Sequence, residues 1–212
     1  VAIIIASAVL GLGTALFYWI KVSSIPLTHG IENKEEAEKL TKITRAIELG
    51  AMAFLKAEYK YMVYFMAGFA ILIGVLIDDP HTPNVSEGIY TAISFLLGCV
   101  ISIASGFIGM RIATIGNART TTAAKNSIAD AFKVALNSGA VMGFGLVGLA
   151  VLGLAVIYLV LDALLPGIDK HILMEVMAGF GLGGSSIALF GRVSGGIFTK
   201  AADVGADLVG KV

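Results

Sequence analysis

The chain has 212 residues, of which 57% are hydrophobic and only 14% are charged, and its mean hydropathy is +0.90. A soluble domain averages about 25% charged residues, and a chain this apolar is not disordered. Fifteen Lys and Arg balance fifteen Asp and Glu, so no net positive charge is available to attract nucleic acid, and we expect no nucleic-acid partner.

The apolar residues lie in five long runs, and a helix needs about 20 of them to cross the hydrocarbon layer. None of the runs alternates apolar and polar residues, as the strands of a transmembrane barrel would. We therefore predict an all-α, polytopic transmembrane helical bundle that forms one integral membrane domain over residues 1–212. The predicted spans are about 1–20, 55–77, 88–111, 134–165 and 172–200.

The first run could instead be a secretory signal, but such signals have shorter apolar regions. Twenty apolar residues that end in Phe17, Tyr18 and Trp19 favour a span with aromatic residues at the interface. The chain opens on Val1 rather than Met. We therefore expect five spans of a larger multi-helix membrane protein.

The connection after the first run is predicted to be helical. Ala37, Leu40, Ile47 and Ala51 recur at helical spacing with Lys and Glu between them. This pattern indicates a solvated, cytoplasmic helix extension over 32–54 that continues into the second span. An interfacial helix that touches lipid is the alternative.

Cations gather in alternate connections, which predicts the orientation in the membrane. The connection at 78–83 has no Lys or Arg, and the one after the fourth run has only Lys170. The positive-inside rule therefore places the N-terminus outside and the C-terminal end in the cytoplasm. The third connection includes the threonines at 120–122, whose hydroxyls could cap the next helix. The cations of the first and third connections are Lys21, Lys34, Lys39, Lys42, Arg45, Lys56 and Lys60, and Arg111, Arg119, Lys125 and Lys133.

Several motifs point to packing rather than chemistry. The glycines at 179–184 resemble a phosphate loop, but they lie inside an apolar run and not in a βαβ unit. Small residues four apart favour close helix contacts in lipid, and Cys99 is predicted to be a buried packing residue. The histidines His29, His81 and His171 are too far apart to predict a zinc site. The small-residue pairs are Gly179 and Gly183, Gly191 and Gly195, and Ala201 and Gly205.

Charged residues recur on one face of the predicted helix end at 192–211. At about 100° per residue, they fall within a face about 100° wide. Exposed ion pairs at this spacing would each contribute only tenths of a kcal/mol. The other positions are mostly Ala, Gly, Val and Leu, which indicates that the charged face looks into a cavity walled by other helices. These residues are Arg192, Lys200, Asp203, Asp207 and Lys211.

This face suits a complex of Mg²⁺ with a phosphate. Asp203 and Asp207 can hold Mg²⁺ while leaving positions for water and phosphate oxygens, and Lys200 can place a point charge on the phosphate. One helix cannot surround a phosphate, and no base for an attacking water is visible. The alternatives are a non-enzymatic channel or transporter with a polar path lined by Arg192, Lys200, Asp203 and Asp207, and a purely structural bundle.

A long segment resembles a known family. Residues 179–211, GFGLGGSSIALFGRVSGGIFTKAADVGADLVGK, are similar to the fifth-helix signature of the ion-pumping, membrane-bound inorganic pyrophosphatases. The GMRIAT segment at 109–114 and the charged first connection are also similar. The resemblance covers the whole chain but only about the first third of a family member, and it implies a homodimer in the lipid bilayer.

The resemblance assigns roles to four residues. Lys200 would contact pyrophosphate, Asp203 and Asp207 would bind its Mg²⁺ complex on the cytoplasmic side, and Arg192 would belong to the ion gate. Ser194 stands where the family usually has glycine, which puts close packing there in doubt.

It also implies an activity, hydrolysis of pyrophosphate coupled to pumping of H⁺ or Na⁺, with K⁺ as a possible activator. The membrane would be the plasma membrane of a prokaryote or an acidic-organelle or vacuolar membrane of a eukaryote. The family's catalytic carboxylates are expected beyond this segment.

Overall fold

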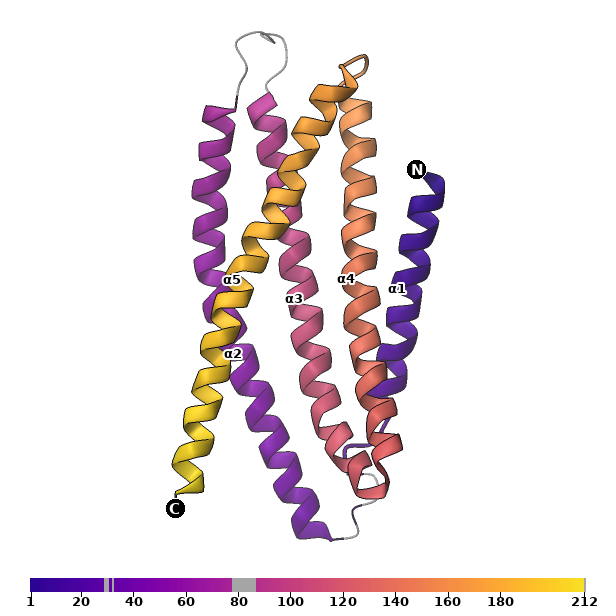
Figure 1. The fold of residues 1–212 in the computed structure, drawn as a ribbon, viewed down its shortest axis with the longest axis vertical. Coiled ribbons are helices and arrows are strands. Elements are labelled where there is room, and N and C mark those ends of the chain that lie inside the picture. Colours follow the sequence, from indigo (N-terminus) through magenta and orange to yellow (C-terminus); the bar gives the residue numbers. More distant parts are fainter. Residues whose placement is uncertain (29–30, 32, 78–86, 212) are drawn as a thin grey trace. The chain divides into compact units, whose positions relative to one another are not determined.

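The computed structural model describes residues 1–28, 31, 33–77 and 87–211, and no strand occurs in this part of the chain. Its five helices are each long and apolar enough to cross a membrane, which confirms the predicted all-α fold. Figure 1 shows them in order as α1 (Ala2–Ser23), α2 (Lys34–Leu76), α3 (Glu87–Asn126), α4 (Ile128–Leu164) and α5 (Lys170–Gly210). The cation-free connection at 78–83, His29 and His81 lie outside the described residues.

The helices divide into two compact units, and α2 and α3 contribute to both. Unit 1 consists of Val1–Ala53 and Ala104–Leu159, and unit 2 of Phe54–Ile103 and Val160–Val212. Unit 1 therefore holds α1 and most of α4, whereas unit 2 holds all of α5. That residues 1–212 act as one membrane domain stays a prediction.

In unit 1, α1 packs against α3 and α4 through a small buried core of Val22, Ile112 and Val141. The backbones of α1 and α4, which lie side by side in Figure 1, approach closely at a glycine. A Cβ atom added at Gly148 would lie 2.9 Å from the Leu12 Cγ. Small residues permit such close contacts between helices in lipid.

Arg119 ties the end of α1 to α3. Its Nε donates to the Ile25 carbonyl oxygen (2.8 Å), and its two terminal nitrogens donate to the carbonyls of Ile115 (2.9 Å) and Ser23 (3.3 Å). Burial lowers the pKa of the Arg119 guanidinium while Glu48 opposes this, but arginine stays charged in proteins. The side chain therefore holds the turn after α1 in place.

The expectation of a polar connection at 120–122 is wrong, because α3 continues as a helix to Asn126. The three threonine hydroxyls donate to carbonyls four residues back in their own helix, at 2.8–3.1 Å. This pairing satisfies each hydroxyl within the helix, so the polar stretch does not end it.

Ser127, rather than a threonine, caps the next helix. Its hydroxyl accepts from the Asp130 backbone nitrogen (3.1 Å) and donates to the Asp130 carboxylate (2.9 Å). The bond from Ser127, and next the bond and charge of Lys133, lower the pKa of Asp130. A cap of this kind stabilises the first turn of α4.

In unit 2, α5 packs on α3 with almost no space between the backbones. A Cβ atom added at Gly183 would lie 2.0 Å from the Phe95 carbonyl oxygen, and one at Gly179 would lie 2.5 Å from that of Thr91. Cys99 is fully buried, and its thiol donates to the Gly183 carbonyl oxygen (3.5 Å). The packing predictions for these glycines and for Cys99 are confirmed.

Aromatic contacts hold α5 against α2 as well. The Phe65 and Phe190 rings lie 4.9 Å apart between centroids, as do the rings of Phe54 and Phe198. These contacts continue a buried cluster in unit 2 and bring the second half of α5 beside α2. The buried members of the cluster are Met62, Met66, Ile73, Phe95, Cys99 and Ile187.

We predict that Gly183→Ala destabilises the full-length protein by about 1–3 kcal/mol, because the added methyl group meets a backbone carbonyl that cannot rotate away. Gly181→Ala is the matched control, since a Cβ atom at Gly181 meets nothing within 4 Å. The melting temperature in detergent measures both. Equal melting temperatures for the two variants would contradict the close approach of α3 and α5.

Candidate functional site

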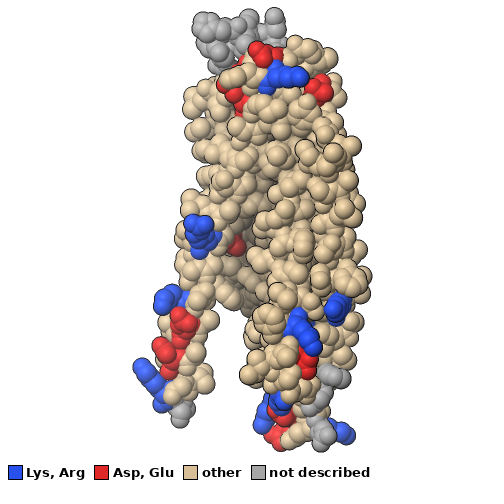
Figure 2. Space-filling model, turned by 45° about the vertical axis from the view of Figure 1, so that its right-hand side comes forward, with Lys and Arg blue, Asp and Glu red and all other residues tan. Residues whose placement is uncertain are grey.

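The predicted charged face lies on one continuous helix. Because α5 runs without a break from Lys170 to Gly210, the five charged residues between 192 and 211 keep the helical spacing that places them on one face. Figure 2 shows that most charged side chains lie toward the ends of the helices, whereas residues without charge cover most of their middle parts. The second half of α5 carries charge of both signs.

Within this face the side chains are only loosely paired. The Lys200 Nζ lies 3.4 Å from the Asp203 Oδ2, and the two side chains are 83% and 58% exposed. The spacing also permits pairs between Lys200 and Asp207 and between Asp207 and Lys211, but neither forms an ion pair among the described residues. Exposed pairs contribute little, so these charges remain available to a ligand.

Within unit 2, no described residue walls the expected cavity beyond Phe198 of α5. Every residue from Thr199 to Gly210 is exposed, on all sides of the helix. The exposed residues include Val204 (57%), Leu208 (65%) and Val209 (77%). An unpartnered apolar surface of this kind is typical of a contact site.

Glu58 of α2 is a neighbour that the sequence did not predict. The Ser194 hydroxyl donates to the Glu58 Oε1 and to the Phe190 carbonyl oxygen of its own helix (2.8 Å). A Cβ atom at Gly191 would lie 4.0 Å from the same Glu58 oxygen. Glu58 therefore faces the turn of α5 that contains the predicted gate residue, Arg192.

The sequence pattern assigned Glu58 no role beyond its place near the start of the predicted span at about 55–77. Its partner is 136 residues away in the chain, so no local spacing could link them. The one available signal was a carboxylate near the start of a predicted span, since charged residues within spans normally have specific partners. Ser194, where glycine was expected, uses its extra hydroxyl to supply that partner.

The carboxylates on α5 fit Mg²⁺ in part. Mg²⁺ is usually held by one or two carboxylates together with waters and phosphate oxygens, and Asp203 and Asp207 offer two. In the described part of the chain, no group of three or more His, Cys, Asp or Glu could hold a metal ion. The donor set therefore suits a metal that arrives with a phosphate ligand.

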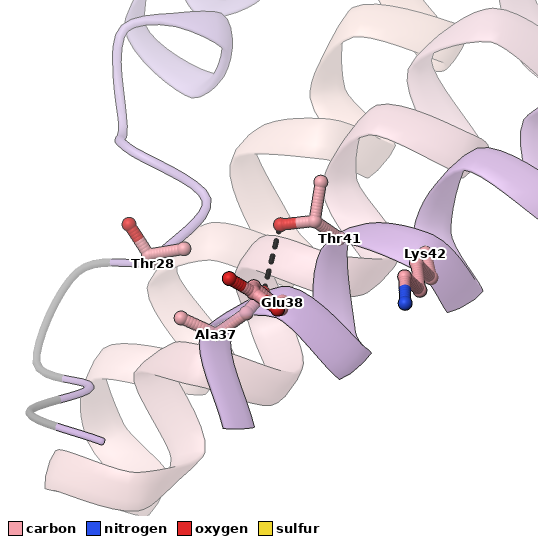
Figure 3. A pocket seen from close by; sticks show the side chains of 5 residues that line it. All are labelled: Thr28, Ala37, Glu38, Thr41 and Lys42. Carbon is pink, nitrogen blue, oxygen red and sulfur yellow. Dashed lines mark hydrogen bonds between the residues drawn. The ribbon is translucent and has the colours of Figure 1, made fainter. Parts of the chain in front are cut away.

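A hollow in unit 1 is a weaker candidate. It has a volume of about 320 Å³ and lies between the turn after α1 and the start of α2 (Figure 3). The Thr41 hydroxyl donates to the Ala37 carbonyl oxygen of its own helix (2.8 Å). One Lys and one Glu leave no net charge to attract a phosphate. The hollow is lined by Thr28, Ala37, Glu38, Thr41 and Lys42.

Comparison with known proteins identifies the family of the chain. Residues 9–212 match the family described as inorganic H⁺ pyrophosphatase. The chain belongs to this family. The matched range includes the whole of the charged face of α5.

Named relatives differ in the ion and in the response to K⁺. The chain is 43% identical over 188 residues to a putative K⁺-stimulated pyrophosphate-energized sodium pump of Bacteroides thetaiotaomicron, covering 86% of this chain and 25% of that protein. It is 40% identical over 182 residues to a K⁺-insensitive pyrophosphate-energized proton pump of Methanosarcina mazei, covering 84% of this chain and 24% of that protein. The chain thus spans about a quarter of the length of these relatives.

We predict that Ser194→Ala destabilises the full-length protein by about 1 kcal/mol, because the Glu58 carboxylate loses its donor. The free energy of unfolding in a denaturing-detergent titration measures this loss. Ser7→Ala is the control, since the Ser7 hydroxyl bonds to the Ile4 carbonyl oxygen of its own helix. In a Glu58→Gln background the effect of Ser194→Ala should shrink, and strict additivity would contradict the contact.

Proposed function

We propose that the protein containing this chain hydrolyses inorganic pyrophosphate and uses the released energy to pump H⁺ or Na⁺ across a membrane. The observation that carries the proposal is the exposed face of α5 with Lys200, Asp203 and Asp207, in a chain that belongs to the inorganic H⁺ pyrophosphatase family. Relatives named as pyrophosphate-energized sodium and proton pumps support it.

In this proposal the residues of α5 bind and orient the substrate. Lys200 places its ammonium charge against a phosphate oxygen, since among the described residues its exposed side chain pairs only with Asp203. Asp203 and Asp207, one helical turn apart, hold hydrated Mg²⁺ on the same face. The metal neutralises the negative charge of the diphosphate.

The rest of the site comes from the remainder of the longer protein. The exposed Val204, Leu208 and Val209 would pack against further helices, which would exclude water and supply the base that activates the attacking water. A homodimer in the lipid bilayer is part of the same proposal. This chain alone would then neither hydrolyse pyrophosphate nor pump ions.

Arg192 would act as the ion gate. It lies eight residues before Lys200, which is about 12 Å along the helix. Its turn of α5 contacts Glu58 through Ser194, so charges of both signs lie in this part of unit 2. A change of charge at the substrate end of α5 could thus shift the positions of the Arg192, Ser194 and Glu58 side chains relative to one another.

The cation distribution supports an orientation with the N-terminus outside and the substrate end of α5 in the cytoplasm. Ions would then leave on the far side of a prokaryotic plasma membrane or enter an acidic organelle or vacuole. K⁺ would be an activator if this protein behaves like the relative named as K⁺-stimulated.

We predict that Lys200→Ala and Asp203→Ala each lower the rate of pyrophosphate hydrolysis by at least about 100-fold, because each removes a charge that the bound substrate requires. Full-length protein in vesicles should hydrolyse pyrophosphate only with Mg²⁺ and should transport ions only while it does so. Phosphate release and the ion gradient are measured together.

Lys39→Ala is the control for Lys200→Ala, because Lys39 is an exposed lysine that pairs with Glu35 at the start of α2. Normal ion transport without pyrophosphate would overturn the pump and favour the channel or transporter. Full hydrolysis by both α5 variants would overturn the assigned binding residues.

We predict that Arg192→Ala reduces ion pumping at least as much as hydrolysis, because a gate residue acts on the ion and not on the phosphate. The number of ions moved per pyrophosphate hydrolysed measures this coupling. Arg45→Ala, an exposed arginine of α2, should leave the ratio unchanged. If pumping and hydrolysis both survive Arg192→Ala, the gate assignment is wrong.

A further inference from the structure

A cationic cavity lies in unit 1, where α1 ends, α3 ends and α4 begins. Its volume is about 550 Å³, and three cations and one carboxylate line it. The cations are Lys21, Arg119 and Lys133, and the carboxylate is that of Asp130. Amides and hydroxyls complete the polar wall, namely Ser24, Thr122, Asn126 and Asn137.

The positive charge in this cavity is not compensated by the residues that line it. Lys133 pairs with Asp130 at 3.3 Å, whereas Arg119 donates to backbone carbonyls. The Lys21 Nζ lies 5.8 Å above the Tyr18 ring and forms no ion pair within the described part of the chain. Three cations against one carboxylate leave two positive charges in excess for an anion. The amides of Asn126 and Asn137 can donate hydrogen bonds to it, whereas the Ser24 and Thr122 hydroxyls already donate to backbone carbonyls.

A second cavity, of about 360 Å³, lies between α1 and α4 and is almost entirely apolar. Its two hydroxyls, of Ser7 and Thr14, both donate to carbonyls of α1 itself at 2.8 Å. The remaining wall is hydrocarbon and backbone. It consists of Ala8, Leu10, Gly11, Phe144, Val147, Gly148 and Val151.

The two cavities lie along the same seam between α1 and α4. At about 100° per residue, Lys21, Thr14 and Leu10 fall within about 60° on α1, and so do Lys133, Phe144 and Val151 on α4. From Thr14 to Lys21 is about 10 Å along the helix. The two cavities therefore lie on the same faces of α1 and α4, with the cationic cavity nearer the end of α1.

The seam is placed in the membrane by the residues of α1. Phe17, Tyr18 and Trp19 are aromatic residues of the kind found at the membrane–water interface, and Lys21 follows two residues after Trp19. With these aromatic residues at the interface, the cationic cavity, which Lys21 lines, would lie at the interface and the apolar cavity would lie in the hydrocarbon region. This order matches the headgroup and the acyl chain of a phospholipid.

We propose that the seam between α1 and α4 binds an anionic phospholipid, with the headgroup phosphate in the cationic cavity and an acyl chain along α1 and α4 into the apolar cavity. Lys21 faces the phosphate together with Lys133, whose pair with Asp130 is exposed and therefore weak, and Arg119 adds positive charge while it holds the turn after α1. A free phosphate ion would use only the cationic cavity, so the apolar cavity favours the lipid. The proposal is independent of pyrophosphate hydrolysis.

Native mass spectrometry of the full-length protein in mild detergent tests this proposal, with phosphatidylglycerol and phosphatidylcholine as probes. We expect Lys21→Gln with Lys133→Gln to bind phosphatidylglycerol about 25-fold more weakly, since each lysine near an anionic lipid contributes about fivefold. Lys34→Gln with Lys39→Gln, which removes the same charge from the exposed start of α2, should not change the affinity. An unchanged melting temperature shows that the variants are folded.

A third variant separates the possible ligands. Val147→Trp fills the apolar cavity and should weaken binding of phosphatidylglycerol without changing binding of inorganic phosphate. If phosphate displaces the lipid and Val147→Trp has no effect, the cavity is a phosphate site and not a lipid site. Equal binding of the two lipids, or an unchanged affinity in the double lysine variant, overturns the proposal. So does the absence of bound lipid, which would mean that another helix of the protein fills the seam.

Discussion

The approach of α5 to α3 is the constraint on which the candidate site depends. At Gly183 the two backbones are so close that even a methyl group would overlap the Phe95 carbonyl oxygen. In lipid, where burial of apolar surface does not drive helices together, such backbone contact is a main source of association. It sets the position of α5 in unit 2, and the aromatic contacts with α2 then direct its second half.

That placement has an electrostatic consequence. Once α5 is held along α2, the Ser194 hydroxyl reaches Glu58, and a carboxylate comes to lie beside the turn that carries Arg192. Further along α5, the side chains no longer pack against unit 2, and Lys200, Asp203 and Asp207 are exposed. One helix thus has a packed half that positions it and an exposed half that carries the charges suited to a metal-bound phosphate.

Unit 1 shows a different use of charge. The Arg119 guanidinium donates its hydrogen bonds to backbone carbonyls at the end of α1, in the turn that follows it and within α3. It therefore stabilises a turn without being neutralised by a carboxylate there. The same cations that predict the cytoplasmic side of the membrane line a cavity at the interface. Orientation and lipid binding can therefore depend on the same side chains.

Some features were predictable because they depend on local spacing. The five apolar runs, the charged face of α5 and the small residues at Gly179 and Gly183 all follow from the helical repeat, and the long motif at 179–211 indicates the family. The threonines at 120–122 were interpreted as a connection because polarity was taken as the end of a helix. Their hydroxyls instead bond to their own backbone, which the sequence pattern did not reveal.

By itself, the sequence determined the all-helical membrane class, the family and the residues that share the face of α5, because each of these depends on composition or on a repeat within one helix. The tertiary structure alone decided the contact of Glu58 with Ser194, the hold of Arg119 on the turn after α1 and the alignment of two cavities along α1 and α4. Each of these joins residues far apart in the chain, and only the packing of helices brings such residues together.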